Sequence, residues 1–388
     1  MSPVPVLHAI TRLIVGGAQE NTMYTTVMLD KDRFRVDVVS GPQTGSEGSL
    51  IDEVRDRGGS LTILPELVRE INLWKDVAAV WKLYRLMKAG GFVVVHTHSS
   101  KAGVLGRVAA RLAGVPIIVH TVHGWSFHDH MKPWLRGMYI ALEKLAASVS
   151  DAMIVVAERD IRKGLQAGIG NHGQFRLIRS AIPLDEFDPE IVDRAAVRKE
   201  LGIPSDVPVL GNVGRFSSQK NPLDWVRVGA IVARELPDCH FLLVGDGPLR
   251  PEVEELLDVS GIANRTILTG LRRDVCRMLA AMDVFLLTSL WEGLPRVIPQ
   301  AMAMRVPVVA NEVDGTVEVI RHGKTGYLCE RGDFGQMAGY CLELLKSSEL
   351  RGEMGRNGRA GVREEFALLR MLSQIEALYE ELLKAKGL

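Results

Sequence analysis

Two kinds of segment alternate along the first half of the chain. Short apolar runs rich in β-branched residues are separated by longer segments with a helical spacing of apolar positions. This alternation is typical of repeated strand–helix–strand units, which build a parallel sheet with helices on both faces. The expected strands are residues 4–10, 35–40, 60–64, 93–96, 117–121, 152–156 and 176–178. The expected helices are residues 18–29, 49–57, 74–89, 101–113, 132–148 and 158–167.

A second series of the same kind follows an acidic, proline-containing stretch at residues 184–190. Its expected strands are residues 208–213, 240–244, 266–268, 284–287, 306–310 and 326–329. The sequence therefore predicts the α/β class, with two Rossmann-like domains whose parallel sheets face each other across a cleft. Ligands of such folds bind beyond the carboxyl ends of the strands.

The length of 388 residues suits two domains, which we place at residues 1–185 and 186–368. A charged amphipathic helix is expected at residues 363–384, and it could pack on either domain. The number of basic residues equals that of acidic residues, 47 each, so no overall field favours a nucleic acid partner.

Composition and the start of the chain bear on its compartment. The four cysteines include no C-x-x-C pair, which argues against a disulfide framework or a thiolate zinc site. The start lacks the features of a signal peptide, and no run of about 18 apolar residues occurs. We expect a cytoplasmic protein.

The densest functional signal is the stretch 288–303, where a strand stops and a Gly-Leu-Pro turn leads into a helix expected near Pro295. Backbone N–H groups from Arg296 onward then lack helical partners, and such a helix start binds phosphate. Glu292 precedes the turn, where its carboxylate could accept hydrogen bonds from sugar hydroxyls; the alternative is a surface turn residue. Gln300 is expected about two turns further along the same helix face.

A second signal follows the strand that opens the second domain. Arg215 directly follows a glycine turn at Gly214, and Lys220 lies five residues after Arg215. A guanidinium binds phosphate oxygens as a fork and an ammonium binds them as a point charge. The alternative is two solvated surface cations. A further glycine turn, at Gly245, is expected to shape the wall of the cleft.

In the first domain, Gly16 and Gly17 join the first strand to the first helix, where the backbone can approach a phosphate closely. Six histidines gather further on: His96, His98, His120, His123, His128 and His130. Apart from Asp129 no carboxylate or cysteine accompanies them, and we assign no metal. His123 directly follows a strand and is the best candidate for contact with a reacting group.

Two familiar strings receive no function. Residues 168–173 match G-x-G-x-x-G, but a helix precedes them and a strand follows them, the reverse of the dinucleotide context. Residues 30–32 match a D-x-D metal string, but they join a helix to the next strand, away from the cleft. We expect neither a cofactor nor a metal.

Six stretches together resemble the retaining glycosyltransferases of family 4, which have the two-domain GT-B fold. They are G-G-A at Gly16, the H-x-H-S-x-K-A-G-x-x-G-R-x-A-A-R run at 96–111, T-x-H-G at Thr121, G-R-x-x-x-x-K at 214–220, V-G-D-G-P at 244–248 and E-G-L-P at Glu292. They occur in the family's order and span nearly the whole chain.

The resemblance implies roles for the matching residues. Arg215 and Lys220 would hold the donor diphosphate, which Gly16 or Gly17 would approach from the other domain. Glu292 would bind hydroxyls of the donor sugar. The other donor-site residues implied are Gly245, Leu271, Leu294, Arg296, Val297 and Gln300.

The resemblance also implies that His123 lies near the sugar and the acceptor, and that residues 369–388 return to the first domain. Attack on the same face of the sugar as the leaving group would retain the anomeric configuration without a metal or an enzymic nucleophile. Two positions depart from the family pattern. Gln300 replaces a glutamate, and Ser180 replaces the asparagine of an N-G-x-D string.

Many relatives in this family use lipid-linked acceptors, so a docking face on an anionic membrane is a hypothesis. Trp74, Trp81, Lys82 and Arg85 lie at helical spacing, and Trp134 lies in a later helix; such residues suit an interfacial helix. The alternative is an apolar stripe that packs on the sheet, formed by Leu73, Val77, Val80, Tyr84 and Met87.

The leading hypothesis is a glycosyltransferase, peripheral on the inner face of the membrane, that acts in surface polysaccharide or glycoconjugate synthesis. Its donor would be a UDP-sugar, with a GDP-sugar as the second choice, and its acceptor a saccharide or a polyprenyl-linked saccharide. The enzymatic alternative is a sugar-nucleotide epimerase of similar fold. The non-enzymatic alternative is a nucleotide-sugar binding protein in which Gln300 marks lost activity.

Overall fold

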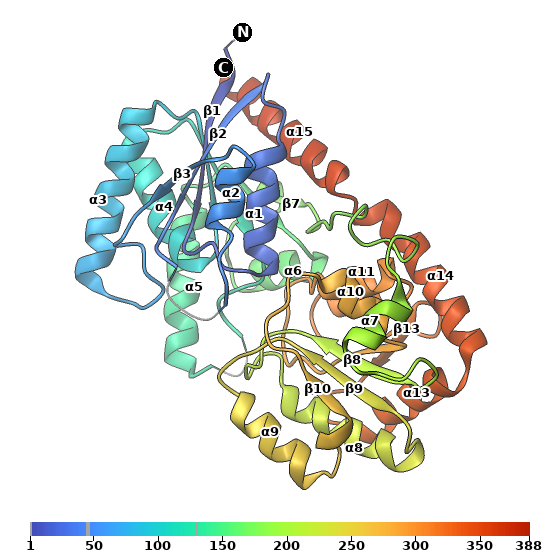
Figure 1. Cartoon of the computed structure of the whole chain (residues 1–388). Coiled ribbons are helices and arrows are strands. Elements are labelled where there is room, and N and C mark those ends of the chain that lie inside the picture. Colours follow the sequence, from blue (N-terminus) through green and yellow to red (C-terminus); the bar gives the residue numbers. More distant parts are fainter. Residues whose placement is uncertain (1, 44–46, 129–130) are drawn as a thin grey trace. The chain divides into compact units, whose positions relative to one another are not determined.

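The computed structural model describes residues 2–43, 47–128 and 131–388. The chain folds into two compact units, Met1–Ser180 with Leu369–Leu388, and Ala181–Leu368 (Figure 1). Each unit is built on one parallel sheet. The sequence places the domain boundary at residue 185, a few residues beyond Ser180, and the roles assigned to the two domains stay predictions.

The sheet of the first unit has the strand order β3-β2-β1-β4-β5-β6-β7. Its strands are β1 (Val4–Ile10), β2 (Phe34–Ser40), β3 (Ser60–Ile63), β4 (Val94–His98), β5 (Ile117–Val122), β6 (Ala152–Val155) and β7 (Phe175–Leu177). The strand order reverses between β1 and β4, so the loops after these two strands diverge to opposite faces of the sheet. Ligands of open α/β sheets bind in the crevice at such a switch point.

Helices connect these strands and cover the sheet (Figure 1). They are α1 (Gly17–Met28), α2 (Ile51–Asp56), α3 (Leu73–Gly90), α4 (Ser100–Ala113), α5 (Pro133–Ala147) and α6 (Glu158–Gln166). The ends of α3 follow the usual chemistry: the Asn72 side chain accepts a hydrogen bond from the Lys75 amide, and Gly91 ends the helix in the left-handed region.

The C-terminal helix α15 (Leu368–Lys386) packs almost entirely on the first unit. Arg33, just before β2, donates to Glu376 at 3.0 Å, and Arg176 on β7 donates to Glu381 at 2.7 Å. Tyr379 is fully buried in the same unit. The helix therefore links the start of β2 to the edge strand β7 of the first sheet.

The sheet of the second unit has the order β10-β9-β8-β11-β12-β13 and reverses between β8 and β11. Its strands are β8 (Val209–Val213), β9 (His240–Val244), β10 (Thr266–Leu268), β11 (Val284–Leu287), β12 (Val308–Asn311) and β13 (Gly326–Cys329). Its helices are α7 (Arg194–Glu200), α8 (Pro222–Glu235), α9 (Arg250–Val259), α10 (Val275–Ala281), α11 (Val297–Ala303), α12 (Thr316–Val319), α13 (Phe334–Lys346) and α14 (Ser348–Glu365).

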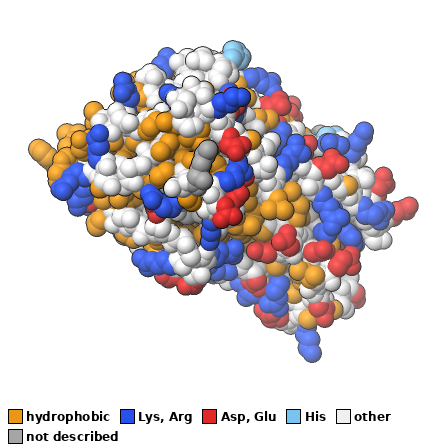
Figure 2. Space-filling model, turned by 90° about the horizontal axis from the view of Figure 1, so that it is seen from above, with side chains coloured by type: hydrophobic (Ala, Val, Ile, Leu, Met, Phe, Trp, Pro, Cys, Tyr) orange, Lys and Arg blue, Asp and Glu red, His pale blue; other side chains and the backbone are white. Residues whose placement is uncertain are grey.

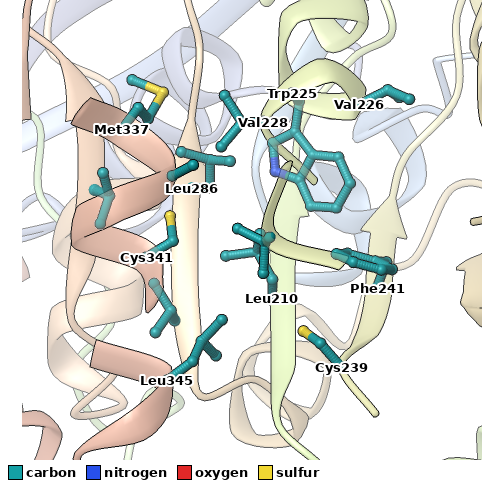
Figure 3. Close-up of a cluster of buried hydrophobic side chains, with 14 of the residues drawn as sticks. Leu210, Trp225, Val226, Val228, Cys239, Phe241, Leu286, Met337, Cys341 and Leu345 are labelled. Carbon is teal, nitrogen blue, oxygen red and sulfur yellow. The ribbon is translucent and has the colours of Figure 1, made fainter. Parts of the chain in front are cut away.

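The core of the second unit lies between α8, α13 and the sheet (Figure 3). Trp225 of α8 packs edge-on against Phe241 of β9, with 6.0 Å between ring centroids. Cys341 of α13 is fully buried in the same cluster, and burial raises the pKa of its thiol well above the ordinary value. Each large apolar side chain buried in this way stabilises the fold by about 1.5–3 kcal/mol.

The expected strands agree with the observed ones to within about two residues at each end. The single helix expected at residues 363–384 is wrong. The chain instead breaks between α14 and α15, where the Phe366 carbonyl accepts a hydrogen bond from the Ile182 amide at 3.0 Å. Phe366 itself is buried, so this tertiary contact outweighs the local helical preference.

Candidate active site

The carboxyl ends of β8 and β11 carry the main candidate residues of the second unit. These strands are neighbours at the switch point, so the loop after β8, with Lys220, lies beside the loop after β11, with Glu292. Hydrogen bonds join the two loops. The Leu290 amide donates to the Gln219 carbonyl at 2.8 Å, and the Gln219 side chain donates to the Trp291 carbonyl at 3.0 Å.

Lys220 and Glu292 form an ion pair between these loops. The Glu292 side chain is only 6% exposed and that of Lys220 is 23% exposed. The Glu292 amide also donates to the Asp314 carboxylate at 2.8 Å. Neither side chain is therefore a fully solvated surface group, and their roles in a donor site stay predictions. The sequence did not predict that they pair.

Tight glycine turns hold the backbone beside this ion pair. The Gly214 amide donates to the Val244 carbonyl at 2.9 Å, and the Gly245 amide donates to the Gly270 carbonyl at 2.9 Å. A Cβ atom on Gly245 would come within 2.1 Å of the Gly214 carbonyl oxygen, and its φ of +133° also excludes most other residues. The ends of β8 and β9 can therefore approach this closely only because residue 245 is a glycine.

The other donor-site candidates fall in different surroundings. Arg215 and Leu271 are exposed, Gln300 and Val297 are partly buried, and Leu294 is buried. Arg296 is buried as well, and its Nε donates to the Ala181 carbonyl at 2.9 Å. That guanidinium therefore supports the fold of the second unit.

Helix α11 begins at Val297, close to the start expected near Pro295, and the Ile298 amide donates to the Pro295 carbonyl at 3.0 Å. One local prediction in this region is wrong. Glu292 lies in the preceding loop, so it does not share a helix face with Gln300. The Gly293 carbonyl in that loop accepts a hydrogen bond from the Gly315 amide at 3.0 Å.

In the first unit the switch point lies between β1 and β4. Gly16 precedes α1 directly, and Ser99 precedes α4 with a φ of +60°. The Ser99 hydroxyl lies 2.8 Å from the Thr11 hydroxyl, which ties the two loops together. Ser99 holds a conformation that costs a non-glycine residue about 1–2 kcal/mol, a cost that often marks a functional loop.

Strand register gathers several of the predicted histidines on one face of the first sheet. His96 and His98 alternate along β4, the register pairs His8 with His96, and it pairs His98 with Thr121. Tyr379 of α15 lies on this face, with its hydroxyl 2.6 Å from Nδ1 of His96. The sequence did not single out His8 or Tyr379, because nothing local announces pairing across such distances.

A continuous chain of hydrogen bonds runs through this face. Nε2 of His96 lies 2.7 Å from the Thr121 hydroxyl, and the Tyr379 hydroxyl lies 3.4 Å from Nε2 of His8. Nδ1 of His8 lies 2.8 Å from Nε2 of His98. Nδ1 of His98 then lies 3.2 Å from Nε2 of His123, the candidate contact with a reacting group.

His123 itself is only partly buried and lines a cavity of about 190 Å³ within the first unit. The same cavity is lined by Ser99, Ser100 and Ser126, which carry hydroxyl groups, and by the buried residue Glu143. The cavity therefore brings hydroxyls, an imidazole and the aromatic ring of Trp125 together.

The remaining members of the histidine group lie elsewhere. His120 is on the opposite face of the sheet, where Nδ1 lies 2.9 Å from the Thr97 hydroxyl. His128 lies in the loop after β5, and His130 and Asp129 lie outside the described residues. Nitrogen atoms of His8, His96 and His98 approach within 4.8 Å of one another. The hydrogen bonds described above account for both ring nitrogens of all three.

Large apolar side chains are exposed on three helices of the first unit. No helix in the described part of the chain is long and apolar enough to span a membrane. The exposed side chains are Ile71, Leu73, Trp74, Val77 and Trp81 at α3, Leu112 at α4, and Trp134, Leu142 and Leu145 on α5. Figure 2 shows hydrophobic side chains gathered at the left of the view among lysines and arginines. We call these nine residues the apolar face.

The stripe that packs on the sheet differs from the expected one. Ala79, Leu83 and Met87 are buried, whereas Leu73 is 72% exposed and Val77 60% exposed. The expected stripe is therefore wrong for the first two turns of α3, because only the later turns of this long helix are covered by the protein core.

Two family models match the chain. Residues 16–172 match the glycosyl transferase 4-like domain, and residues 207–347 match the glycosyl transferases group 1. A curated relative from Escherichia coli, UDP-Gal:alpha-D-GlcNAc-diphosphoundecaprenol alpha-1,3-galactosyltransferase, is 30% identical over 99% of both chains. The chain belongs to the group 1 glycosyltransferases. This confirms the predicted family and the predicted enzyme class.

A second curated relative and two solved structures are also similar to this glycosyltransferase. N-acetyl-alpha-D-glucosaminyl L-malate synthase of Bacillus anthracis is 36% identical over 50% of both chains. The solved structure of Anabaena HepE in complex with UDP-glucose has a TM-score of 0.84 at 20% identity and covers 97% of this chain and 99% of that one. WaaG, a glycosyltransferase of lipopolysaccharide biosynthesis, has a TM-score of 0.77 at 16% identity and covers 96% and 98%. The predicted GT-B fold is confirmed.

Proposed function

We propose that this glycosyltransferase moves a hexosyl or N-acetylhexosaminyl group from a UDP-sugar to a polyprenyl diphosphate-linked saccharide, with retention of configuration. The observation that carries the proposal is the ion pair of Lys220 and Glu292 at the switch point of the second sheet. The E. coli relative, whose name gives a UDP-sugar donor and a lipid-linked acceptor, supports the choice of substrates.

The two members of the ion pair suit the two parts of a nucleotide-sugar donor, its diphosphate and its sugar. A diphosphate has a high density of negative charge, so it would compete with Glu292 for the ammonium of Lys220. Arg215, which is exposed in the same loop, would bring a second cation to the diphosphate. The Glu292 carboxylate, released from Lys220, would then accept hydrogen bonds from the hydroxyls of the donor sugar.

The cations would also assist the chemical step. As the bond between the sugar and the diphosphate breaks, negative charge grows on the leaving oxygen, and Lys220 and Arg215 would stabilise it. We propose that a phosphate oxygen of the donor takes the proton of the acceptor hydroxyl on the same face. In this scheme no protein side chain forms a bond to the sugar.

We further propose that the apolar face docks on an anionic membrane. Trp74 is 85% exposed and Trp134 68%, and large apolar side chains so exposed indicate an interaction surface. The Arg85 guanidinium lies 4.9 Å from the centroid of the Trp81 ring, so the basic and aromatic groups needed at a lipid headgroup region occur together. An enzyme docked on the membrane in this way would have access to a lipid-linked acceptor.

Thermal stabilisation by nucleotide sugars tests the donor. A ligand at a hundred times its dissociation constant stabilises the native protein by about 2.7 kcal/mol. We expect a UDP-sugar to raise the melting temperature of the wild type, and GDP-sugars to do so less. Lys220→Ala should abolish this shift, whereas Lys199→Ala, at an exposed lysine of α7, should keep it. A shift that survives Lys220→Ala would contradict the assignment.

Vesicle flotation tests the membrane proposal. Wild type should float with vesicles that contain anionic lipid, and Trp74→Ser with Trp134→Ser should leave the protein in the soluble fraction. The matched control is Val259→Ser in the second unit, at a residue that is 80% exposed but outside the apolar face. Equal flotation of both variants would overturn the proposal.

A further inference from the structure

The loop after β11, which carries Glu292, lies between two other loops of the second sheet. Strand β8 is the neighbour of β11 on one side, and β12 is its neighbour on the other. The loop after β8 contacts this loop through Gln219 and Lys220. The loop after β12 contacts it through Asp314 and Gly315. Residues from both neighbouring loops therefore hold the segment around Glu292.

The peptide group between Trp291 and Glu292 is hydrogen-bonded at both of its polar ends. Its carbonyl oxygen accepts from the Gln219 side chain at 3.0 Å, and its amide donates to the Asp314 carboxylate at 2.8 Å. Because a peptide group is planar, bonds at both ends fix the orientation of its plane. Rotation of the plane would break both bonds in a partly buried loop, which is unfavourable. The direction in which the Glu292 side chain leaves the backbone is thereby set.

Asp314 holds a backbone conformation that residues with a Cβ atom rarely adopt. Its φ is +35°, on the left-handed side, where aspartate and asparagine are the commonest residues after glycine. The next residue, Gly315, donates through its amide to the Gly293 carbonyl at 3.0 Å, and a Cβ atom on Gly315 would collide with the same oxygen. This turn brings the backbones of the two loops into contact. A glycine at position 314 would suit the turn but would supply no carboxylate to the Glu292 amide.

We propose that Asp314 is a positioning residue of the donor site: by holding the peptide before Glu292, it directs the Glu292 carboxylate to the donor sugar. The enzyme then prefers a nucleotide sugar to the bare nucleotide. The functional part of this inference rests on the proposed role of Glu292 in binding sugar hydroxyls. Asp314 contacts neither the sugar nor the diphosphate in this scheme, and the diphosphate is bound by Lys220 and Arg215.

A purely structural role is the rival interpretation of Asp314. In that case its carboxylate only joins two loops, and its removal lowers stability without any selective effect on the sugar. Stability falls under both interpretations, so it does not separate them. The affinity for a UDP-sugar relative to that for UDP does separate them, because only the positioning role acts on the sugar alone.

Two substitutions at position 314 separate the carboxylate from the backbone conformation. Asp314→Asn keeps a residue that tolerates positive φ, and its side-chain carbonyl can still accept a hydrogen bond from the Glu292 amide. Asp314→Gly also suits the conformation but removes the acceptor. The matched control is Asp193→Ala, at an exposed residue of the same unit whose carboxylate accepts from the Ala196 amide at 3.0 Å. This control removes the same kind of hydrogen bond from the start of α7.

Hydrogen exchange of the Glu292 amide tests the positioning without any ligand. NMR of the protein labelled with ¹⁵N-glutamate follows this amide, and Glu292→Gln assigns its signal. In Asp314→Gly we expect exchange on the order of tenfold faster than in the wild type, as the loss of one hydrogen bond predicts. Asp314→Asn and Asp193→Ala should stay close to the wild type. Unchanged exchange in Asp314→Gly would overturn the proposal.

Calorimetric titration tests the effect on the sugar. The ligands are UDP and either UDP-glucose or UDP-galactose, whichever raises the melting temperature of the wild type more. In Asp314→Gly we expect the ratio of the Kd for the UDP-sugar to that for UDP to rise on the order of tenfold. Asp314→Asn and Asp193→Ala should keep the wild-type ratio. A ratio that is unchanged in Asp314→Gly would overturn the proposal.

The two experiments also distinguish this proposal from the proposed function. A wild-type protein that binds none of these ligands would contradict the proposed function. The exchange of the Glu292 amide would still decide whether Asp314 positions the peptide before Glu292.

Discussion

The ammonium of Lys220 and the carboxylate of Glu292 form an ion pair, although 72 positions separate them in the sequence. They meet because β8 and β11 are neighbours where the strand order of the second sheet reverses. In the absence of a ligand each group neutralises the other. A nucleotide-sugar donor would give each group a new partner, since its diphosphate would bind the lysine and its sugar hydroxyls would donate hydrogen bonds to the carboxylate.

Removal of Lys220 should cost stability as well as donor binding. In Lys220→Ala the Glu292 carboxylate, which is 6% exposed, loses its cationic partner. Leaving a buried polar group without its partner costs about 1–3 kcal/mol. Urea denaturation should show a loss of this size, and Lys220→Ala with Glu292→Gln should recover part of it. A double variant less stable than Lys220→Ala alone would show that the pair does not act in this way.

Gly245 should tolerate no side chain. Its Cβ position lies 2.1 Å from the Gly214 carbonyl oxygen, so Gly245→Ala must displace one of the two strand ends. We expect a loss of about 3 kcal/mol in the free energy of unfolding. Gly339→Ala is the control, since Gly339 is an exposed position of α13 and nothing lies within 4 Å of its Cβ position. It should stabilise the protein by about 0.5–1 kcal/mol.

Stability should fall as the pH is lowered from about 6.5. The folded-state pKa values of His8, His96, His98 and His120 lie below the ordinary value of 6.5, and that of His8 is about 3. Between the folded-state pKa values and 6.5, the histidines of the unfolded chain bind protons that those of the folded chain do not. Their contribution to the free energy of unfolding is therefore fully present above pH 6.5 and is lost as the pH falls below it. Each histidine contributes up to about 1.4 kcal/mol per pH unit.

Unfolding free energies measured from pH 7.5 to pH 5 check this dependence. His8→Asn should reduce the slope, and His172→Gln, at an exposed histidine, should leave it unchanged. A stability that is flat across this range, or that rises on acidification, would show that the buried histidines titrate normally.

Loss of one partner of the buried ion pair of Arg107 and Glu143 should destabilise the protein more than replacement of both partners by apolar residues. Arg107 Nη2 donates to Glu143 at 2.7 Å, and the two side chains are 0% and 4% exposed. Glu143→Ala leaves an uncompensated buried guanidinium, which costs about 3–5 kcal/mol. Arg107→Met with Glu143→Leu should be more stable than Glu143→Ala alone. Differential scanning calorimetry of the three proteins decides the order.

The sequence predicts the strands because they depend on local signals: each strand is an apolar run bounded by turn residues. Lys220 and Glu292 lie in the loops after two such runs, and their donor-site roles stay predictions. The chain of His8, His98 and Tyr379 has no local signal, because it depends on strand register and on the packing of α15. For the first turns of α3 the sequence leaves an exposed face and a packed stripe as alternatives, since periodicity shows that a stripe exists but not what covers it.

Transfer of labelled sugar tests the central claim most directly. The enzyme is incubated with UDP-sugars, a polyprenyl diphosphate-linked N-acetylglucosamine acceptor and anionic vesicles, and the products are separated and analysed by NMR. We predict a labelled lipid-linked disaccharide with the anomeric configuration of the donor, UDP release that requires the acceptor, and loss of both in Lys220→Ala. Release of UDP and an altered free sugar without an acceptor would contradict the account and identify an epimerase. Donor binding without any turnover would contradict it in favour of a binding protein.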